Sequence, residues 1–169
     1  TLLDTPGHVD FAAEMERTLQ VLDYAVLVIS AADGVQGHVE TLWQLLKRYE
    51  IPVFLFVNKM DQEGTSRERL LAELKERLHG QCVDFGGMQE RQAGAKEAGK
   101  AAAGPDNPAA LTAELQEELA LCDESLLEKY LAGEAIGEEE IRSLIAARKV
   151  FPCYFGSALK LWGVEALLN

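Results

Sequence analysis

Continuous apolar runs that alternate with amphipathic segments are the strongest pattern in the chain. Residues 25–29 (Ala-Val-Leu-Val-Ile) and 53–57 (Val-Phe-Leu-Phe-Val) contain no polar residue. Runs of this length, rich in β-branched residues, are typical of strands that are buried on both faces of a parallel sheet. Shorter apolar stretches of similar character predict two more strands. The predicted strands are residues 2–3, 25–29, 53–57 and 150–155.

The segments between these runs have the 3.6-residue period of helices. Apolar residues recur on one face of residues 9–22 and of residues 39–49. Ser66 is a plausible N-cap for a third helix that ends near Leu78, because its hydroxyl can accept from a free N–H of the first turn. Strand and helix therefore alternate, which predicts an α/β fold with a mostly parallel sheet and three layers.

The composition changes at about residue 81. Residues 86–109 are rich in Gly, Ala and Pro and predict a mobile loop, since they have little to bury. Residues 111–140 then hold ten acidic residues against one lysine, 1 − 10 = −9, which favours a solvated face over a site for a basic partner. Residues 1–80 and 150–169 are the predicted core, and residues 81–149 are an insertion. The other predicted helices are residues 111–121, 124–131, 138–147 and 164–168.

Composition narrows the classes of function. The 16 basic and 28 acidic residues give a net charge of 16 − 28 = −12, which argues against a long nucleic-acid contact surface on this chain. Three cysteines, without a C-x-x-C pair or a histidine at metal-ligand spacing, indicate reduced thiols and a cytoplasmic protein. No apolar run approaches the roughly 18–20 residues of a membrane span, so we expect no membrane contact.

Residues 4–8 read Asp-Thr-Pro-Gly-His and follow a predicted strand. A carboxylate there can hold Mg²⁺ through a water, and a glycine three residues later lets a backbone N–H approach a γ-phosphate. A strand followed by such a turn is common, so this motif alone is equally compatible with a structural turn. The predicted phosphate-side residues are Asp4, Thr5, Pro6, Gly7 and His8, with Asp4 as the Mg²⁺ residue.

Two further motifs follow predicted strands, Asn-Lys-Met-Asp at 58–61 and Gly-Ser-Ala-Leu at 156–159. The carboxylate of Asp61 can accept from the adjacent N1–H and N2–H₂ donors of guanine, while the stem of Lys59 covers the base and the N–H of Ala158 reaches its O6. Each motif alone could be structural. Together, at the carboxyl ends of parallel strands, they predict a guanine site. The predicted base-side residues are Asn58, Lys59, Asp61, Ser157, Ala158 and Leu159.

These motifs, with Ala-Asp-Gly-Val-Gln at 32–36 and Leu-Leu-Glu-Lys-Tyr-Leu-Ala-Gly-Glu at 126–134, resemble the G domain of elongation factor G and its relatives. The short insertion and the segment Phe-Pro-Cys-Tyr-Phe-Gly-Ser-Ala-Leu are more similar to the tetracycline-resistance ribosomal protection proteins. The resemblance implies a P-loop GTPase that uses GTP/GDP and Mg²⁺ and acts on the ribosome. It also implies that His8 positions the attacking water, whereas His38 and His79 are predicted at surface helix positions.

The phosphate loop of such a domain, G-x-x-x-x-G-K-[ST], should precede Asp4, and no match precedes it. Residues 94–101 have the spacing, but Ala101 replaces the hydroxyl residue and the segment follows residues 58–61. We therefore expect a G-domain fragment that begins at residues 4–8, lacks the first strands and binds GTP weakly. Exposed sheet edges would then allow a dimer in a crystal. The alternatives are a fragment of an elongation factor G-like translocase and a non-catalytic interaction module that kept the G fold.

Overall fold

A sheet of four parallel strands forms the centre of the computed structural model, which describes residues 1–4, 17–86 and 113–168. The spatial order is β1-β2-β4-β3, and β1 pairs with β2 along its whole length, from Ala25↔Val53 to Ser30↔Asn58. Helices follow the strands, so the α/β fold predicted from the sequence is confirmed. The strands are β1 (Ala25–Ser30), β2 (Val53–Asn58), β3 (Cys82–Asp84) and β4 (Phe151–Phe155).

Helices begin and end where their local sequence favours it. The helix α3 begins after Ser66, whose hydroxyl accepts from the backbone N–H of Arg69 at 3.3 Å. The helix α2 has Glu40 in its first turn and basic residues in its last, which suits the helix dipole. The described helices are α2 (Gly37–Arg48), α3 (Arg67–Arg77), α5 (Ala113–Ala120), α6 (Glu124–Leu131), α7 (Glu138–Ala146) and α8 (Val164–Leu168).

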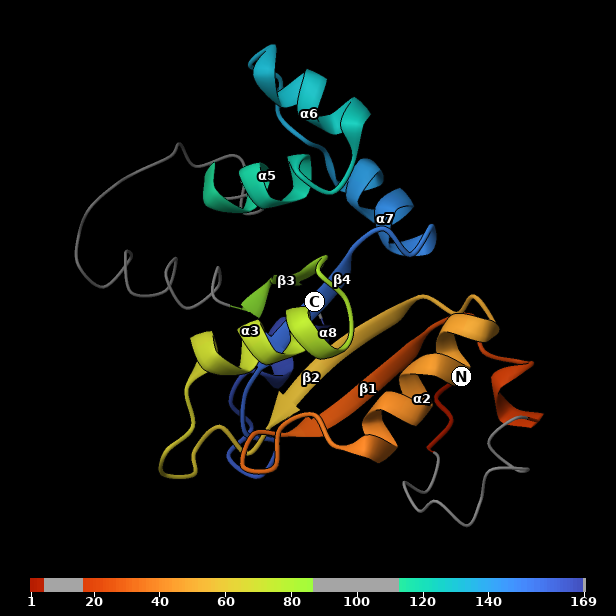
Figure 1. Ribbon diagram of the computed structural model, residues 1–169, viewed down its shortest axis with the longest axis vertical. Coiled ribbons are helices and arrows are strands. Elements are labelled where there is room, and N and C mark those ends of the chain that lie inside the picture. Colours follow the sequence, from red (N-terminus) through yellow and green to blue (C-terminus); the bar gives the residue numbers. More distant parts are fainter. Residues whose placement is uncertain (5–16, 87–112, 169) are drawn as a thin grey trace.

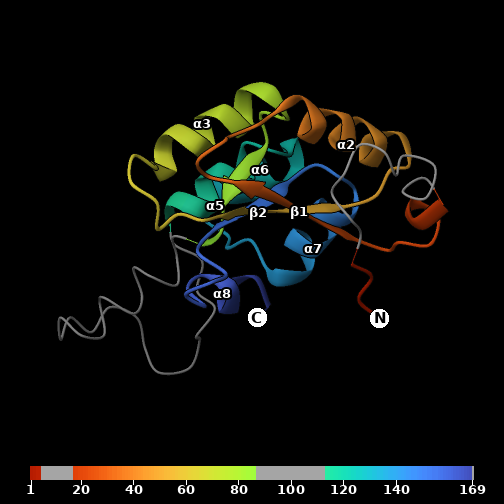
Figure 2. The same ribbon diagram turned by 90° about the horizontal axis from the view of Figure 1, so that it is seen from below.

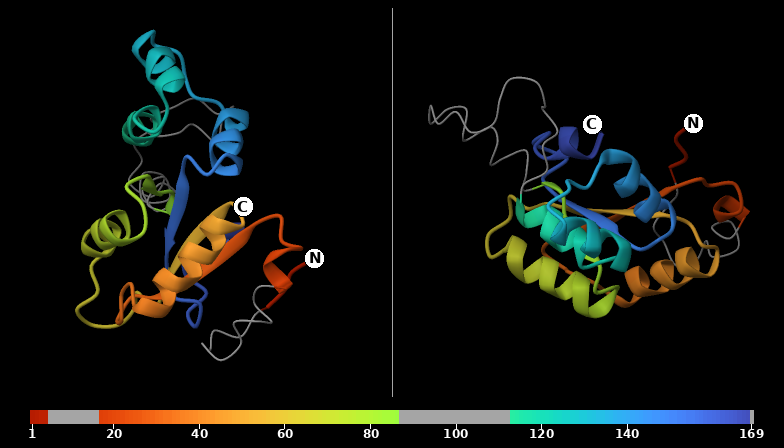
Figure 3. Two further views of the ribbon diagram at one scale, coloured as in Figure 1. Left: turned by 45° about the vertical axis from the view of Figure 1, so that its right-hand side comes forward. Right: turned by 90° about the horizontal axis from the view of Figure 1, so that it is seen from above.

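The main core lies between the sheet and the helices α2 and α3, which cover one face together (Figures 1 and 2). Trp43 of α2 is 1% exposed and its ring meets that of Phe151 at 4.7 Å in an edge-to-face arrangement. The helix α8 lies on the opposite face, as the second panel of Figure 3 also shows. The core therefore supports the strands directly, and the loops at their carboxyl ends project from a rigid base.

The helices α5, α6 and α7 form a second cluster at the end of the sheet opposite these loops (Figure 1). Their apolar residues, such as the fully buried Leu119, pack with Val83 of β3 and with Val150 just before β4. Asp123 caps α6 by accepting from the N–H of Ser125 at 3.0 Å. The acidic helices predicted from the sequence are thus present and packed against the sheet.

Two expectations for the strands are wrong. Leu2 and Leu3 form no strand, because residues 1–4 are exposed and pair with no described strand. The strand β1 is buried on one face only: Leu27 is 7% exposed, whereas Val26 is 48% and Val28 57% exposed. No described helix covers β1 on that face, and β1 is an edge strand of the described sheet. A continuous apolar run therefore does not guarantee two covered faces.

Two local features differ from the sequence interpretation. The strand β3 was not predicted, and it places residues 82–84 in the main sheet beside β4, with Cys82↔Phe151 in register. His79 is not at a surface helix position: it follows α3, and its ring lies edge-on against Phe151 at 4.9 Å. His38 is exposed on α2, as expected.

Several expectations fall on residues outside those described. They are most of the helix predicted at residues 9–22, nearly all of the loop predicted at residues 86–109, and the phosphate-loop near-match at residues 94–101. Among the described helices, none has the length and apolar character needed to cross a membrane.

Candidate nucleotide site

The two motifs predicted to face a base meet where β2 and β4 end. Asn58 is the last residue of β2, and its side-chain oxygen Oδ1 accepts from two backbone N–H groups, that of Lys59 at 2.8 Å and that of Ala158 at 2.9 Å. A residue one hundred positions away in the sequence is thereby fixed beside the strand end. The register explains this, because β2 and β4 are parallel neighbours whose carboxyl ends lie at one edge of the sheet.

The turn after β4 is held by its own backbone. Ser157 and Trp162 exchange two backbone hydrogen bonds, of 3.0 and 3.1 Å, and the N–H of Met60 donates to the carbonyl of Gly156 at 3.0 Å. A side chain at Gly156 would lie 2.3 Å from the carbonyl oxygen of Trp162. Only glycine fits there, because a Cβ would collide with backbone that cannot move away. The turn 156–163 is therefore a rigid platform.

Asp61 and Ser157 lie together beside this platform. The Ser157 hydroxyl is the main cause that lowers the pKa of the Asp61 carboxyl, ahead of the backbone N–H of Asp61 and the ammonium of Lys160. Lys160 Nζ lies 3.4 Å from Asp61 Oδ2. Ser157 is 1% exposed, and a hydroxyl that donates to Asp61 keeps lone pairs with which it can accept. The site thus combines an ionised carboxylate with a buried hydroxyl that has bonding capacity left.

Two predicted base-side residues are exposed. Lys59 has a left-handed backbone, with φ of 65°, and its side chain is exposed. This conformation costs about 1–2 kcal/mol for a residue with a Cβ, and the Asn58 oxygen that accepts from its N–H stabilises it. Leu159 is 91% exposed at the tip of the turn 156–163. Both side chains are free to contact a ligand above the strand ends.

Of the phosphate-side residues the structure describes Asp4 alone, and Asp4 is not brought to these loops. Asp4 is exposed, and the N-terminus lies at the other end of the sheet from the turn 156–163 (Figures 1 and 2). Residues 5–8 lie outside those described. The described residues also contain no group of three or more His, Cys, Asp or Glu side chains that could hold a metal ion. The roles of Asp4, Gly7 and His8, and the Mg²⁺ site, remain predictions.

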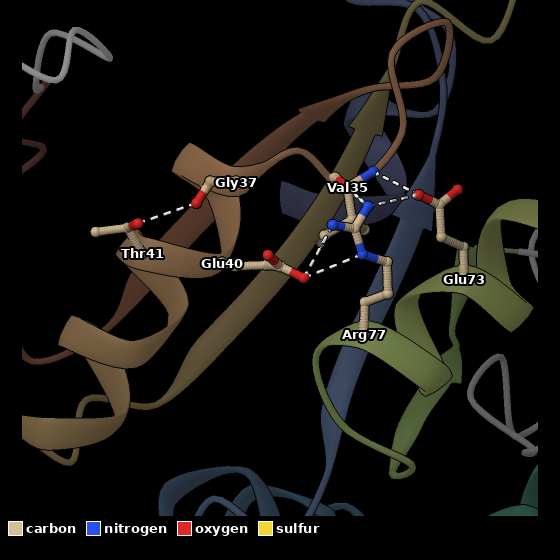
Figure 4. Close-up of polar contacts among 6 residues, drawn as sticks. All are labelled: Val35, Gly37, Glu40, Thr41, Glu73 and Arg77. Atoms are coloured by element: carbon tan, nitrogen blue, oxygen red, sulfur yellow. Dashed lines mark hydrogen bonds and ion pairs between the residues drawn. The ribbon is translucent and has the colours of Figure 1, made fainter.

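The loop between β1 and α2 is fastened by side chains that sequence reasoning missed (Figure 4). Glu73 Oε1 accepts from the N–H of Val35 at 2.8 Å, and the guanidinium of Arg77 donates to the carbonyl of Val35 and, at 3.0 Å, to Glu40. A Cβ at Gly34, where φ is 67°, would meet Glu73 at 2.7 Å. The only available sequence signal was the four-residue spacing of Glu73 and Arg77 on α3.

The described geometry fits the base of a guanine nucleotide. It offers the Asp61 carboxylate for the N1–H and N2–H₂ donors and the buried Ser157 hydroxyl beside it. The Ala158 N–H is already bonded to Asn58, so it would have to share its hydrogen with a guanine O6. Fold and site together have the character of a nucleotide-binding domain of the parallel α/β class.

Comparison with known proteins identifies the family. The family model described as the elongation factor Tu GTP binding domain matches residues 1–169, and the chain belongs to this family. It is also similar to a crystal structure of a protein from Thermus thermophilus, with a TM-score of 0.72 and 25% sequence identity. That match covers 99% of this chain and 28% of the other, so the chain spans little more than a quarter of its relative. The chain therefore belongs to a family of GTP-binding domains of translation factors, and the ligand of that family is a guanine nucleotide.

Proposed function

We propose that these residues form the base-recognition part of a GTPase that acts on the ribosome and is of the ribosomal protection type. The observation that carries the proposal is the meeting of the two distant motifs at the ends of β2 and β4, where Asn58 Oδ1 accepts from the N–H of Ala158 at 2.9 Å. That hydrogen bond has a structural role of its own. What favours a guanine site is the carboxylate of Asp61 beside it, kept ionised and partly exposed.

In this proposal Asp61 accepts both donors of the guanine edge. Asn58 holds the two loops at a fixed separation, Ala158 offers its N–H to O6, and the side chains of Lys59 and Leu159 cover the base. The loops are held by hydrogen bonds between protein groups, so little binding free energy should be lost in ordering them. Bound GTP supplies the γ-phosphoryl group that is hydrolysed.

The phosphate side of the reaction rests on the sequence alone. Asp4 would hold Mg²⁺ through a water, Thr5 and Pro6 would shape the turn, and Gly7 would offer its N–H to the γ-phosphate. His8 would orient the attacking water. Replacement of His8 by Ala should then lower ribosome-stimulated GTP hydrolysis and leave GDP affinity unchanged. If the His8→Ala variant and the unaltered protein hydrolyse GTP at the same rate, His8 does not take part in the reaction.

Base recognition is tested most directly at Asp61. In a protein that carries these residues together with a phosphate loop, Asp61→Asn should move preference from guanine to xanthine nucleotides, because the amide can donate to the oxygen that xanthine has in place of the amino group. The assay is competition of XDP and GDP against a fluorescent nucleotide. An unchanged preference for GDP would exclude Asp61 from the base site.

The polypeptide of these 169 residues should bind GTP only weakly. Its sequence has no match to G-x-x-x-x-G-K-[ST], so the lysine and hydroxyl that stabilise the phosphates are missing from it. A titration with fluorescent GDP measures this. Micromolar or tighter affinity would show that base contacts, or another phosphate site, suffice.

Two alternative functions are compatible with the same motifs and the same fold. An elongation factor G-like translocase shares every motif named above, and the short insertion between β3 and β4 is what favours the ribosomal protection type. A non-catalytic module that kept the G fold would also keep the core. GTP hydrolysis by the whole protein on ribosomes separates the module from both enzymes, and rescue of translation from tetracycline separates the two enzymes.

A further inference from the structure

Lys160 forms an ion pair with Asp61, the residue that the proposed function assigns to base recognition. Its ammonium Nζ lies 3.4 Å from Oδ2 of Asp61 and is held on the turn 156–163, where the N–H of Lys160 donates to the carbonyl of Ser157 at 3.1 Å. The Asp61 side chain is 24% exposed and that of Lys160 is 63% exposed. The ion pair is therefore open to solvent, from which a base must also reach the carboxylate.

A guanine edge needs both oxygens of that carboxylate. Its N1–H and N2–H₂ donors are adjacent and parallel, so each takes one oxygen, as a guanidinium does in a bidentate pair. The ammonium at Oδ2 already engages one of the two. Since Lys160 belongs to a rigid turn but has a flexible side chain, it can swing away, and the loops need not move.

We propose that the Lys160 ammonium competes with the 2-amino group of guanine for Asp61, and so sets both the affinity for guanine and the preference for bases that carry that group. This rests on the proposed function. It adds an affinity-determining residue that does not itself bind the base. Loss of the ammonium should tighten binding of guanine and leave a base without the amino group unaffected.

The size of the effect follows from the exposure of the pair. An ion pair between solvent-exposed side chains is weak and is screened by salt, so its removal is expected to change an affinity by about two- to fivefold. Lys160→Met keeps the length of the side chain and removes its charge. Lys149→Met is the matched control, because Lys149 pairs with Asp123, is 52% exposed and lies before β4, at the opposite end of that strand from the turn.

The experiment titrates the 169-residue chain with guanosine and inosine 5′-monophosphates, followed by amide chemical shifts. Hypoxanthine, the base of inosine, has N1–H but lacks the 2-amino group, and the phosphate is the same in both ligands. Lys160→Met should bind GMP about two- to fivefold more tightly and IMP unchanged at low salt. The control should bind both as the unaltered chain does. In an Asp61→Ala background, Lys160→Met should have no effect on GMP.

The outcomes separate the two proposals. If GMP binding depends on Asp61 but Lys160→Met leaves it unchanged, or tightens IMP equally, the inference about Lys160 is overturned and the base site stands. If GMP binding does not depend on Asp61, or is no tighter than that of AMP, the base site itself is overturned and Lys160 with it. A selective gain for GMP that disappears at high salt supports both.

Discussion

Replacement of Asn58 separates the structural role of this residue from any contact with a base. In the structure its Oδ1 accepts from the N–H groups of Lys59 and Ala158, at 2.8 and 2.9 Å, and so joins the loop after β2 to the turn after β4. The variant Asn58→Ala removes this oxygen. Asn58→Asp keeps an acceptor of the same shape at the same place.

The expected loss of stability follows from those two bonds. Both N–H groups are near solvent, so water replaces the lost acceptor and each bond contributes only about 0.5–1.5 kcal/mol. Asn58→Ala should therefore lower the free energy of unfolding by about 1–2 kcal/mol. Asn58→Asp should stay within about 0.5 kcal/mol of the unaltered chain, since hydrogen bonds to a charged acceptor are at least as strong.

Urea unfolding, followed by far-UV circular dichroism, measures both variants by linear extrapolation. A high salt concentration screens repulsion between the new carboxylate and Asp61. If Asn58→Ala is as stable as the unaltered chain, the two bonds do not hold the loops together. If Asn58→Asp at high salt is as unstable as Asn58→Ala, the acceptor is not the cause of the loss.

Two further predictions concern pH and the turn 156–163. Burial, together with two nearby basic side chains, lowers the pKa of His79 below its usual value near 6.5, so its contribution to stability is present above that pH and is lost as pH falls below it. From pH 7 to pH 5 the free energy of unfolding, measured in urea, should fall less in His79→Phe than in the unaltered chain. An equal fall in the two proteins would contradict this. Gly163→Ala should cost about 3 kcal/mol or more in the same assay, because φ is 75° and a Cβ would lie 2.3 Å from a backbone carbonyl oxygen. Gly64→Ala, with φ of 81° but open space, should cost only about 1 kcal/mol, and equal costs would refute the collision.

The sequence was most informative where local pattern and function coincide. Residues 25–29 and 53–57 could be assigned to strands because they are too short for a typical helix and are rich in β-branched and aromatic residues. If the strands that precede Asn58 and Ala158 are parallel neighbours, their carboxyl ends lie together, and the two residues are expected to be close in space. The central sheet and the base-side loops were therefore predictable.

What could not be predicted depends on partners distant in sequence. The strand β3 has three residues, and only its pairing with β4 makes it a strand. The exposure of Val26 and Val28 depends on which elements cover that face of β1, and the run itself carries no such information. His79 was predicted at the surface because its packing partner, Phe151, lies far away in the sequence, on β4. The ion pair of Lys160 with Asp61 likewise requires the two loops to be placed first.

The base-side loops are ordered by the protein itself, and this has a consequence for binding. The hydrogen bonds of the Asn58 oxygen, of the Ser157–Trp162 backbone pair and between Met60 and Gly156 all join protein groups. Binding of a base should therefore cost little free energy for ordering these loops. Differences in affinity between bases must then come from the groups that each base displaces or pairs with. Of the described side chains at the site, the Asp61 carboxylate is the one that is both ionised and already engaged by a displaceable cation. Selection among bases should then change most with substitutions at Asp61 and Lys160, whereas substitutions at Asn58 and Gly163 should change stability first.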